Sequence, residues 1–140
     1  MKRRMQIIRL VSLKADSFYE DTQELARQGQ KALEEMGKSQ LKNLKGVADY
    51  ALKVSDVLNY IKQQGARHSG WRKDNFADKL ITKIEGKVRK DMEETCSQLT
   101  SPPASELEKQ EIYLMLIREY MKQFTTHYFY SSSGVTGNGS

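Results

Sequence analysis

The most apolar continuous stretch of the chain covers residues 105–130 and predicts one long helix. Its apolar residues recur at steps of three and four, which is the spacing of one helical face. This stripe consists of Leu114, Ile117, Met121, Phe124 and Tyr128. Tyr113, Leu116 and Tyr120 widen it well beyond one face. Because a helix that is apolar over so much of its circumference is usually the central helix of a bundle, we expect residues 105–130 to organise the core.

The start of this helix is marked by two signals. Pro102 and Pro103 cannot continue a preceding helix, so residues 100–104 are predicted to form a linker. Ser105 and Glu108 then have the spacing of a capping box, in which each side chain accepts a hydrogen bond from the other residue's backbone N–H.

Residues 1–15 suit either a helix or a short strand, and we prefer the helix because their apolar residues share one helical face with Phe18. That face comprises Met5, Ile8, Val11, Ala15 and Phe18. A second helix is predicted over residues 18–36, with a capping box of Ser17 and Glu20.

The second helix is expected to end before Gly37, because glycine adopts the left-handed conformation of a helix end at little cost. Gly29 and Ala32 lie on its apolar stripe. Their small size permits a close approach by a neighbouring helix.

A third helix is predicted over residues 39–64, ending at Gly65. Its apolar residues follow steps of three and four and fall on one side of the helix. They are Leu44, Val47, Ala51, Val54, Leu58 and Ile61. The opposite side is rich in lysine, beginning with Lys38, Lys42 and Lys45.

A fourth helix is predicted over residues 76–99, after a loop in which Asp74 or Asn75 is a suitable cap. Its apolar residues recur mostly at steps of four, so the stripe winds slowly round a regular helix. They are Phe76, Leu80, Ile84, Val88, Met92, Cys96 and Leu99. Gly86 in the middle indicates either a close approach by a neighbour or a kink.

These patterns predict an all-α fold, a single-domain helical bundle of about five helices spanning residues 1–130. The composition agrees: the chain has 140 residues, of which 38% are hydrophobic and 29% charged, and its only two prolines share one linker. Residues 131–140 are rich in glycine and serine and are predicted to be a disordered tail.

Charge and cysteine content indicate the kind of partner and the cellular compartment to expect. The net charge is +5, a mild bias towards polyanionic partners. The single cysteine, Cys96, excludes an internal disulfide framework and is expected to be a buried apolar residue in a reducing compartment. No apolar run reaches the length of a membrane span, and a transit peptide is a minor alternative for the basic start of the chain. We expect a cytoplasmic protein that does not contact a membrane.

No motif for catalysis is visible. The sequence contains no glycine-rich phosphate loop and no Cys/His spacing for zinc. His68 and His127 lie far apart, and neither has a partner at helical spacing. We therefore expect no enzymatic activity, no cofactor and no metal, with Cys96 and His127 in structural roles.

The features that remain are basic. Lysines follow the fourth helix at steps of three and four, a second lysine row lies on the third helix, and three cations surround Trp71 in the loop between them. Cations on one side of a protein bind nucleic-acid backbone independently of sequence. The candidate nucleic-acid-binding residues are Lys38, Lys42, Lys45, Arg67, Arg72, Lys73, Lys79, Lys83, Lys87 and Lys90.

Each of these features also has a simpler interpretation. A lysine stripe is by default a solvated face, and a single tryptophan is more often an anchor at the edge of a core than a platform for a stacked base. The sequence also allows a helical protein-interaction adaptor with no nucleic-acid role. That adaptor would present Tyr120, Phe129 and Tyr130 to a partner.

The order of helices, with a lysine-bearing middle section and a closing helix that ends in REYMKQFTTHYFY (residues 118–130), resembles the small subunit of CRISPR effector complexes of the Cascade type, similar to types I-D and I-B. The abrupt start MKRRMQIIRLVSL suits the internal translation start from which such subunits arise. The resemblance covers about residues 15–130, and no diagnostic motif carries over to individual residues.

The resemblance implies a non-catalytic role in antiviral defence. Copies of such a subunit stack with the backbone and large subunits of a ribonucleoprotein. They hold the duplex of guide RNA and target DNA and the displaced DNA strand through phosphate contacts, while base pairing reads the sequence.

Overall fold

The computed structural model describes residues 2–36 and 38–132. Its α-helices are α1 (Lys2–Asp16), α2 (Phe18–Gln28), α3 (Gln30–Met36), α4 (Lys38–Tyr50), α5 (Val54–Arg67), α6 (Phe76–Lys83), α7 (Arg89–Ser97) and α8 (Glu106–Ser132). A 3₁₀ segment, η1 (Ser69–Asn75), precedes α6, and a π-helical turn, η2 (Ile84–Val88), joins α6 to α7. The described part of the chain contains no strand, so the protein is all-α, as predicted.

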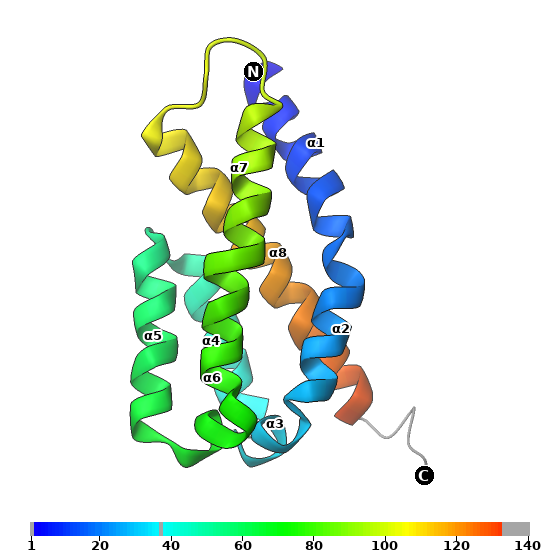
Figure 1. The fold of residues 1–140 in the computed structure, drawn as a ribbon, viewed down its shortest axis with the longest axis vertical. Coiled ribbons are helices and arrows are strands. Elements are labelled where there is room, and N and C mark those ends of the chain that lie inside the picture. The colour runs from blue at the N-terminus through cyan, green and yellow to red at the C-terminus, as the bar shows by residue number, and fades with distance from the viewer. Residues whose placement is uncertain (1, 37, 133–140) are drawn as a thin grey trace.

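The helix α8 runs obliquely through the bundle and is its central element (Figure 1). The α1–α2 segment lies along one side of the molecule, the continuous α6–η2–α7 helix crosses the middle, and α5 lies on the other side. Helices α1, α2, α4, α5 and α7 and the turn η2 all contact α8. The prediction that the apolar stretch near the C-terminus organises the core is confirmed.

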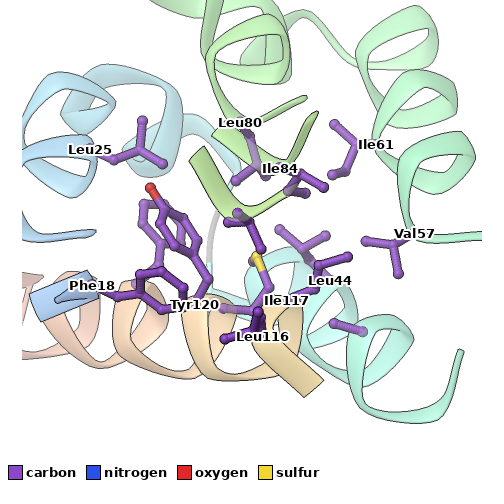
Figure 2. Packing of buried hydrophobic residues seen from close by; sticks show 14 of the residues in the cluster. Phe18, Leu25, Leu44, Val57, Ile61, Leu80, Ile84, Leu116, Ile117 and Tyr120 are labelled. Carbon is purple, nitrogen blue, oxygen red and sulfur yellow. The ribbon is translucent and has the colours of Figure 1, made fainter. Parts of the chain in front are cut away.

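The core is built of large side chains from several helices that pack against α8, whose Leu116, Ile117 and Tyr120 face them (Figure 2). Phe18 and Tyr120 meet edge to face with ring centroids 5.3 Å apart. Phe76 stacks on Phe124 at 5.7 Å and also contacts the buried ring of Trp71. Since aromatic pairs in these geometries add stabilisation beyond the area they bury, this row of rings joins α2, α6 and α8 firmly.

Each of the five predicted helices exists, but two of them are interrupted. The second bends at Gly29, between α2 and α3. The third is broken at residues 51–53, between α4 and α5. Arg118 of α8 explains how α4 can end there, because its guanidinium donates hydrogen bonds of 2.9 Å to the carbonyl oxygens of Ala48 and Ala51.

The predicted capping box at the start of α8 is confirmed, whereas the predicted caps at the starts of α2 and α6 do not form. The capping box forms: the Ser105 N–H donates to Glu108 at 3.2 Å, and the Glu108 N–H donates to Ser105 Oγ at 3.1 Å. Ser17 is not a cap, since its backbone is helical and its hydroxyl donates to the Lys14 carbonyl, so α1 and α2 are nearly continuous. Asn75 precedes α6 in the left-handed conformation without a side-chain cap.

Two further boundaries differ from the prediction. The helix α5 passes through Gly65 and ends at Arg67. The helix α8 extends to Ser132, two residues into the predicted tail. Gly37 and residues 133–140 lie outside the described residues.

Gly86 marks a change of helical geometry and not a close approach. A Cβ atom built on Gly86 meets nothing within 4 Å, whereas the π-helical turn is centred on this residue. Apolar residues spaced by four drift about 40° per step round an α-helix. The wider turn takes up this drift, and the stripe residues from Phe76 to Met92 are all buried.

Gly29 has the opposite environment, and we expect Gly29→Ala to lower the free energy of unfolding by about 1–3 kcal/mol. An added Cβ would lie 2.7 Å from Cδ1 of Phe76, whose ring is held by Phe124 and Trp71. Gly46→Ala is the control, because a Cβ atom at this position meets nothing within 4 Å. This substitution should stabilise α4 by about 0.5–1 kcal/mol. Urea unfolding of both variants measures the difference, and a stabilised Gly29→Ala would contradict the packing.

Candidate nucleic-acid interface

The lysine row of α4 is only partly available. Lys42 is exposed, whereas Lys45 is half-buried and its ammonium forms an ion pair of 2.9 Å with Asp49. The side chain of Lys38 lies outside the described residues. Among the described side chains of this row, Lys42 is therefore the lysine that forms no ion pair.

The basic loop before α6 forms a compact cationic surface. Arg67 and Arg72 are exposed, and Arg72 Nη1 donates a hydrogen bond of 2.6 Å to the Gly65 carbonyl oxygen. Lys73 forms an ion pair of 3.3 Å with Glu35. The backbone anchor of Arg72 ties the η1 segment to the end of α5 and fixes where this guanidinium lies.

Lys62 joins this surface, although the sequence analysis did not single it out. Lys62 and Arg72 line one hollow of about 240 Å³ beside Trp71. Arg67 lines a second hollow, to which Trp71 also contributes. We name Lys62, Arg67 and Arg72 the η1 cation cluster. The sequence could have indicated Lys62 from its position on the polar side of α5, one helical turn before Gly65.

Trp71 itself does not offer a stacking surface. Its side chain is fully buried, and its indole Nε1 donates a hydrogen bond of 2.6 Å to Gln40 Oε1 of α4. The ring packs between Tyr60 and Phe76. Of the two interpretations left open by the sequence, the structure selects the anchor.

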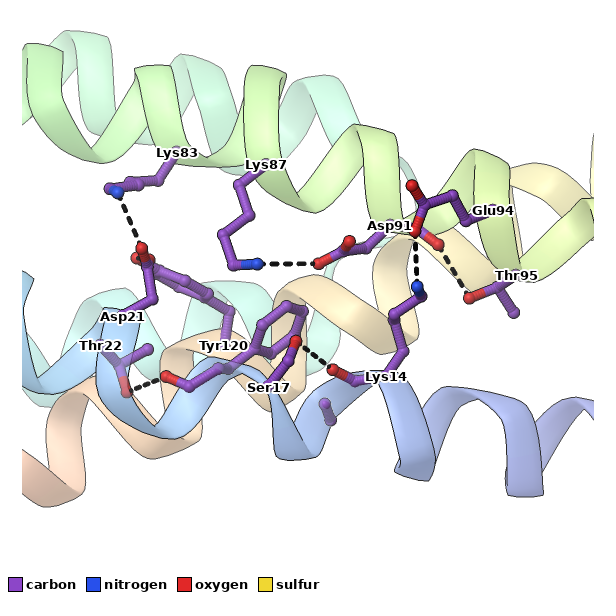
Figure 3. A network of polar contacts seen from close by, with 12 residues as sticks. Lys14, Ser17, Asp21, Thr22, Lys83, Lys87, Asp91, Glu94, Thr95 and Tyr120 are labelled. Atoms are coloured by element: carbon purple, nitrogen blue, oxygen red, sulfur yellow. Dashed lines mark hydrogen bonds and ion pairs between the residues drawn. The ribbon is translucent and has the colours of Figure 1, made fainter.

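The lysine stripe of the fourth predicted helix does not form a single solvated row (Figure 3). Lys83 turns towards α2 and forms an ion pair of 2.8 Å with Asp21. Lys87 lies 3.4 Å from Asp91, and its ammonium is 5.6 Å from the centroid of the Phe18 ring. Lys79 is half-buried and Lys90 is exposed. The two central lysines therefore join helices together.

We name the polar contacts between the α6–η2–α7 helix and the helices α1, α2 and α8 the seam, and Asp21 lies at its centre. It accepts a hydrogen bond of 2.6 Å from the Tyr120 hydroxyl in addition to the contact with Lys83. Burial favours the neutral acid, but the hydrogen bonds from Lys83 and Tyr120 and the charges of Lys83 and Lys87 outweigh it, so the pKa of Asp21 lies below its usual value. Burial and the Asp21 carboxylate both raise the pKa of Tyr120.

A second ion pair extends the seam along α7. Lys14 of α1 contacts Glu94 and, by hydrogen bonding and charge, lowers the pKa of that carboxyl. Asp91 is buried, and its Oδ2 atom has no hydrogen bond although Lys87 lies within ion-pair distance. The seam thus connects α1, α2, α6, η2, α7 and α8 through ion pairs and hydrogen bonds, and it is a structural feature.

The aromatic residues of α8 are not all available to a partner. Tyr120 is fully buried, so the expectation that it docks a neighbour is wrong, because its hydroxyl is committed to Asp21. Phe129 is half-buried against Tyr128. Tyr130 is exposed.

The isolated reactive side chains occupy structural positions. Cys96 is half-buried beside Met92, and burial raises the pKa of its thiol. His127 lies against the Tyr19 ring, with Nε2 3.0 Å from the Tyr19 carbonyl oxygen. Among residues 2–36 and 38–132, no group of three or more His, Cys, Asp or Glu side chains could hold a metal ion. No helix in these ranges combines the length and apolar character needed to cross a bilayer.

Comparisons of the chain with models of protein families, with curated proteins and with solved structures give no match.

Proposed function

We propose that this protein is a non-catalytic subunit that binds nucleic-acid backbone, and that its setting is the small-subunit position of a CRISPR ribonucleoprotein effector complex. The single observation that carries the binding role is the η1 cation cluster. Within the described residues, Lys62, Arg67 and Arg72 are exposed and form no ion pair. Two acids of the described part of the chain share their surface: Asp78 lines the hollow with Lys62 and Arg72, and Glu35, which pairs with Lys73, lines the hollow with Arg67.

The chemistry of this cluster suits phosphate. Arg72 uses Nη1 to hold backbone carbonyls, so Nε and Nη2 can donate to a phosphate oxygen from a fixed position. Arg67 and Lys62 add charge in the two hollows that Trp71 also lines. The backbone anchor lowers the entropic cost of ordering the Arg72 guanidinium, and binding through phosphate contacts is independent of base sequence.

Lys42, Lys79 and Lys90 extend the proposed contact beyond the cluster, since they also form no ion pair among the described residues. Lys83 and Lys87 are left out of the proposal because their charges are engaged inside the bundle. The partners in this setting are guide RNA, target DNA, further copies of the chain, and the backbone and large subunits.

We expect Arg67→Glu/Arg72→Glu to weaken binding of a labelled single-stranded DNA by about tenfold and to make the salt dependence of the affinity shallower by about one to two phosphate contacts. Fluorescence anisotropy across a range of ionic strength measures both quantities. Lys53→Glu/Lys122→Glu is the matched control, because it changes the net charge equally at exposed positions on α8 and at the connection between α4 and α5.

The comparison with the control decides the proposal. Equal weakening by both double variants would show that the binding depends on net charge alone and not on the η1 cation cluster. Unchanged binding in the Arg67→Glu/Arg72→Glu variant, with an unchanged melting temperature, would end the proposal.

A further inference from the structure

The first helix exposes three large apolar side chains, as many as the apolar residues that it buries. The helix α1 contributes only Ile7, Val11 and Ala15 to the core. Its other large apolar side chains point outwards: Met5 is 51% exposed, Ile8 40% and Leu13 74%. The predicted core face, which included Met5 and Ile8, is therefore wrong at the start of the helix. An outward row of this kind indicates a surface that contacts another molecule.

This outward face borders a hollow of about 820 Å³ between α1 and the chain that links α7 to α8. Met5, Leu10 and Leu13 give it an apolar floor, and Thr100 and Ser101 form part of its wall. At 100° per residue, Met5, Arg9 and Leu13 lie within one 80° sector of the helix. The surface is therefore concave and elongated along α1.

The wall of this hollow is firmly attached to α1. Arg3 forms a two-point ion pair with Glu108 at 2.9 and 3.0 Å and donates a hydrogen bond of 2.7 Å to the Thr100 carbonyl oxygen. Gln6 accepts hydrogen bonds from the backbone and the hydroxyl of Thr100. A preformed hollow costs little ordering entropy when an occupant binds.

The charge around the hollow has one sign. Lys2 and Arg9 line it, Arg4 is exposed on the same helix, and α1 has no acid before Asp16. Among residues 2–36 and 38–132, no acidic side chain lines the hollow. Among the cations that line the hollow, Arg3 has its charge compensated by an ion pair with Glu108. An occupant must therefore combine apolar side chains with negative charge.

We infer that the outer face of α1 is a docking site for an acidic amphipathic helix of a partner protein. Leucine-type side chains of the partner pack on Met5, Leu10 and Leu13, and its carboxylates meet Lys2 and Arg9. A concave hollow fits a helix better than a flat bilayer does, and nucleic acid has phosphates but no counterpart for the exposed Leu13 side chain. The site is separate from the η1 cation cluster and does not depend on the function proposed for it.

The test uses a fluorescein-labelled helical peptide of about five turns, with leucines at positions i, i+3, i+4 and i+7 and glutamates beside them. A second peptide replaces each glutamate with lysine. We expect saturable binding of the acidic peptide to the full chain and none of the lysine peptide. Arg9→Glu/Leu13→Glu should weaken binding by at least about tenfold.

The matched control is Leu52→Glu/Lys53→Glu, which alters one exposed leucine and one exposed lysine at the connection between α4 and α5 and should leave peptide binding unchanged. A charge exchange adds a second test: Lys2→Glu/Arg9→Glu should gain binding of the lysine peptide. This gain of function stays informative even if one variant is less stable.

Three results would overturn the inference. The first is an absence of saturable binding of the acidic peptide. The second is equal weakening by the α1 variant and the control. The third is binding to phosphatidylserine vesicles, to single-stranded DNA or to a second copy of the chain that is stronger than peptide binding and is lost in Arg9→Glu/Leu13→Glu, since it would assign the face to that occupant.

Discussion

Replacing Phe124 with alanine is expected to lower the free energy of unfolding by about 3–5 kcal/mol, the largest effect of any single change considered. Phe124 is fully buried in the middle of α8 and stacks on Phe76. The Phe76 ring in turn covers Gly29 and contacts Trp71. Removing the phenyl ring therefore leaves a cavity beside the Phe76 ring, which cannot close without moving the bend in α2–α3.

Guanidinium or urea unfolding followed by circular dichroism measures this change. Leu107→Ala is the control on the same helix, since Leu107 is 70% exposed and its loss should change the stability by no more than about 0.5 kcal/mol. A Phe124→Ala variant as stable as Leu107→Ala would contradict the central position of α8 in the core.

Replacing Asp21 with asparagine is expected to lower the stability at neutral pH by about 1–3 kcal/mol. The carboxylate accepts from Lys83 at 2.8 Å and from the Tyr120 hydroxyl at 2.6 Å, and its side chain is only 20% exposed. The variant leaves the Lys83 ammonium beside a neutral amide, so part of the attraction that holds α6 against α2 is lost. Lys83 is partly solvated, which keeps the loss below that of a fully buried pair.

The same contact predicts a pH dependence with a definite sign. Because the folded pKa of Asp21 lies below its unfolded value, the unfolded chain binds the proton more readily as the pH falls. Its contribution is complete above the unfolded pKa of about 4 and is lost as the pH falls through the lower folded pKa. Asp21→Asn should therefore flatten the acid limb of the stability profile. An acid limb as steep as that of the wild type would contradict this assignment.

Two hydroxyl deletions separate the role of Asp21 from general packing. Tyr120→Phe removes a donor to the Asp21 carboxylate, so it should both destabilise the protein and reduce the acid dependence. Tyr113→Phe removes a hydroxyl that donates to the backbone carbonyl of Ile84 at 2.7 Å, where no carboxylate takes part. It should destabilise the protein without changing the acid limb.

The periodicity of the sequence was sufficient to predict the helices and the central position of α8, because these depend on side chains close together in the chain. It could not predict the interruptions. The bend at Gly29 accommodates the Phe76 ring, which is far away in sequence. The end of α4 depends on Arg118 from α8, which supplies donors to two carbonyls that a continuous helix would have satisfied internally.

The candidate site was predicted less well for the same reason. The spacing of Lys83 and Lys87 correctly placed both on one side of a helix, but it could not show that this side faces Asp21 and Phe18 of α2. The cations near Trp71 were identified from sequence because they are neighbours in the chain. Lys62 was missed because only the packing of α5 on η1 brings it to Arg72.

The π-helical turn at Ile84–Val88 has a consequence for changes in chain length. One residue more or fewer in this turn rotates everything beyond it by about 100° relative to α6. Met92 and Thr95 would then leave the core, and Glu94 would leave Lys14. The number of residues between Phe76 and Met92, more than the identity of Gly86, therefore sets the phase between the two halves of this helix, so an insertion or deletion here is a more severe change than most substitutions.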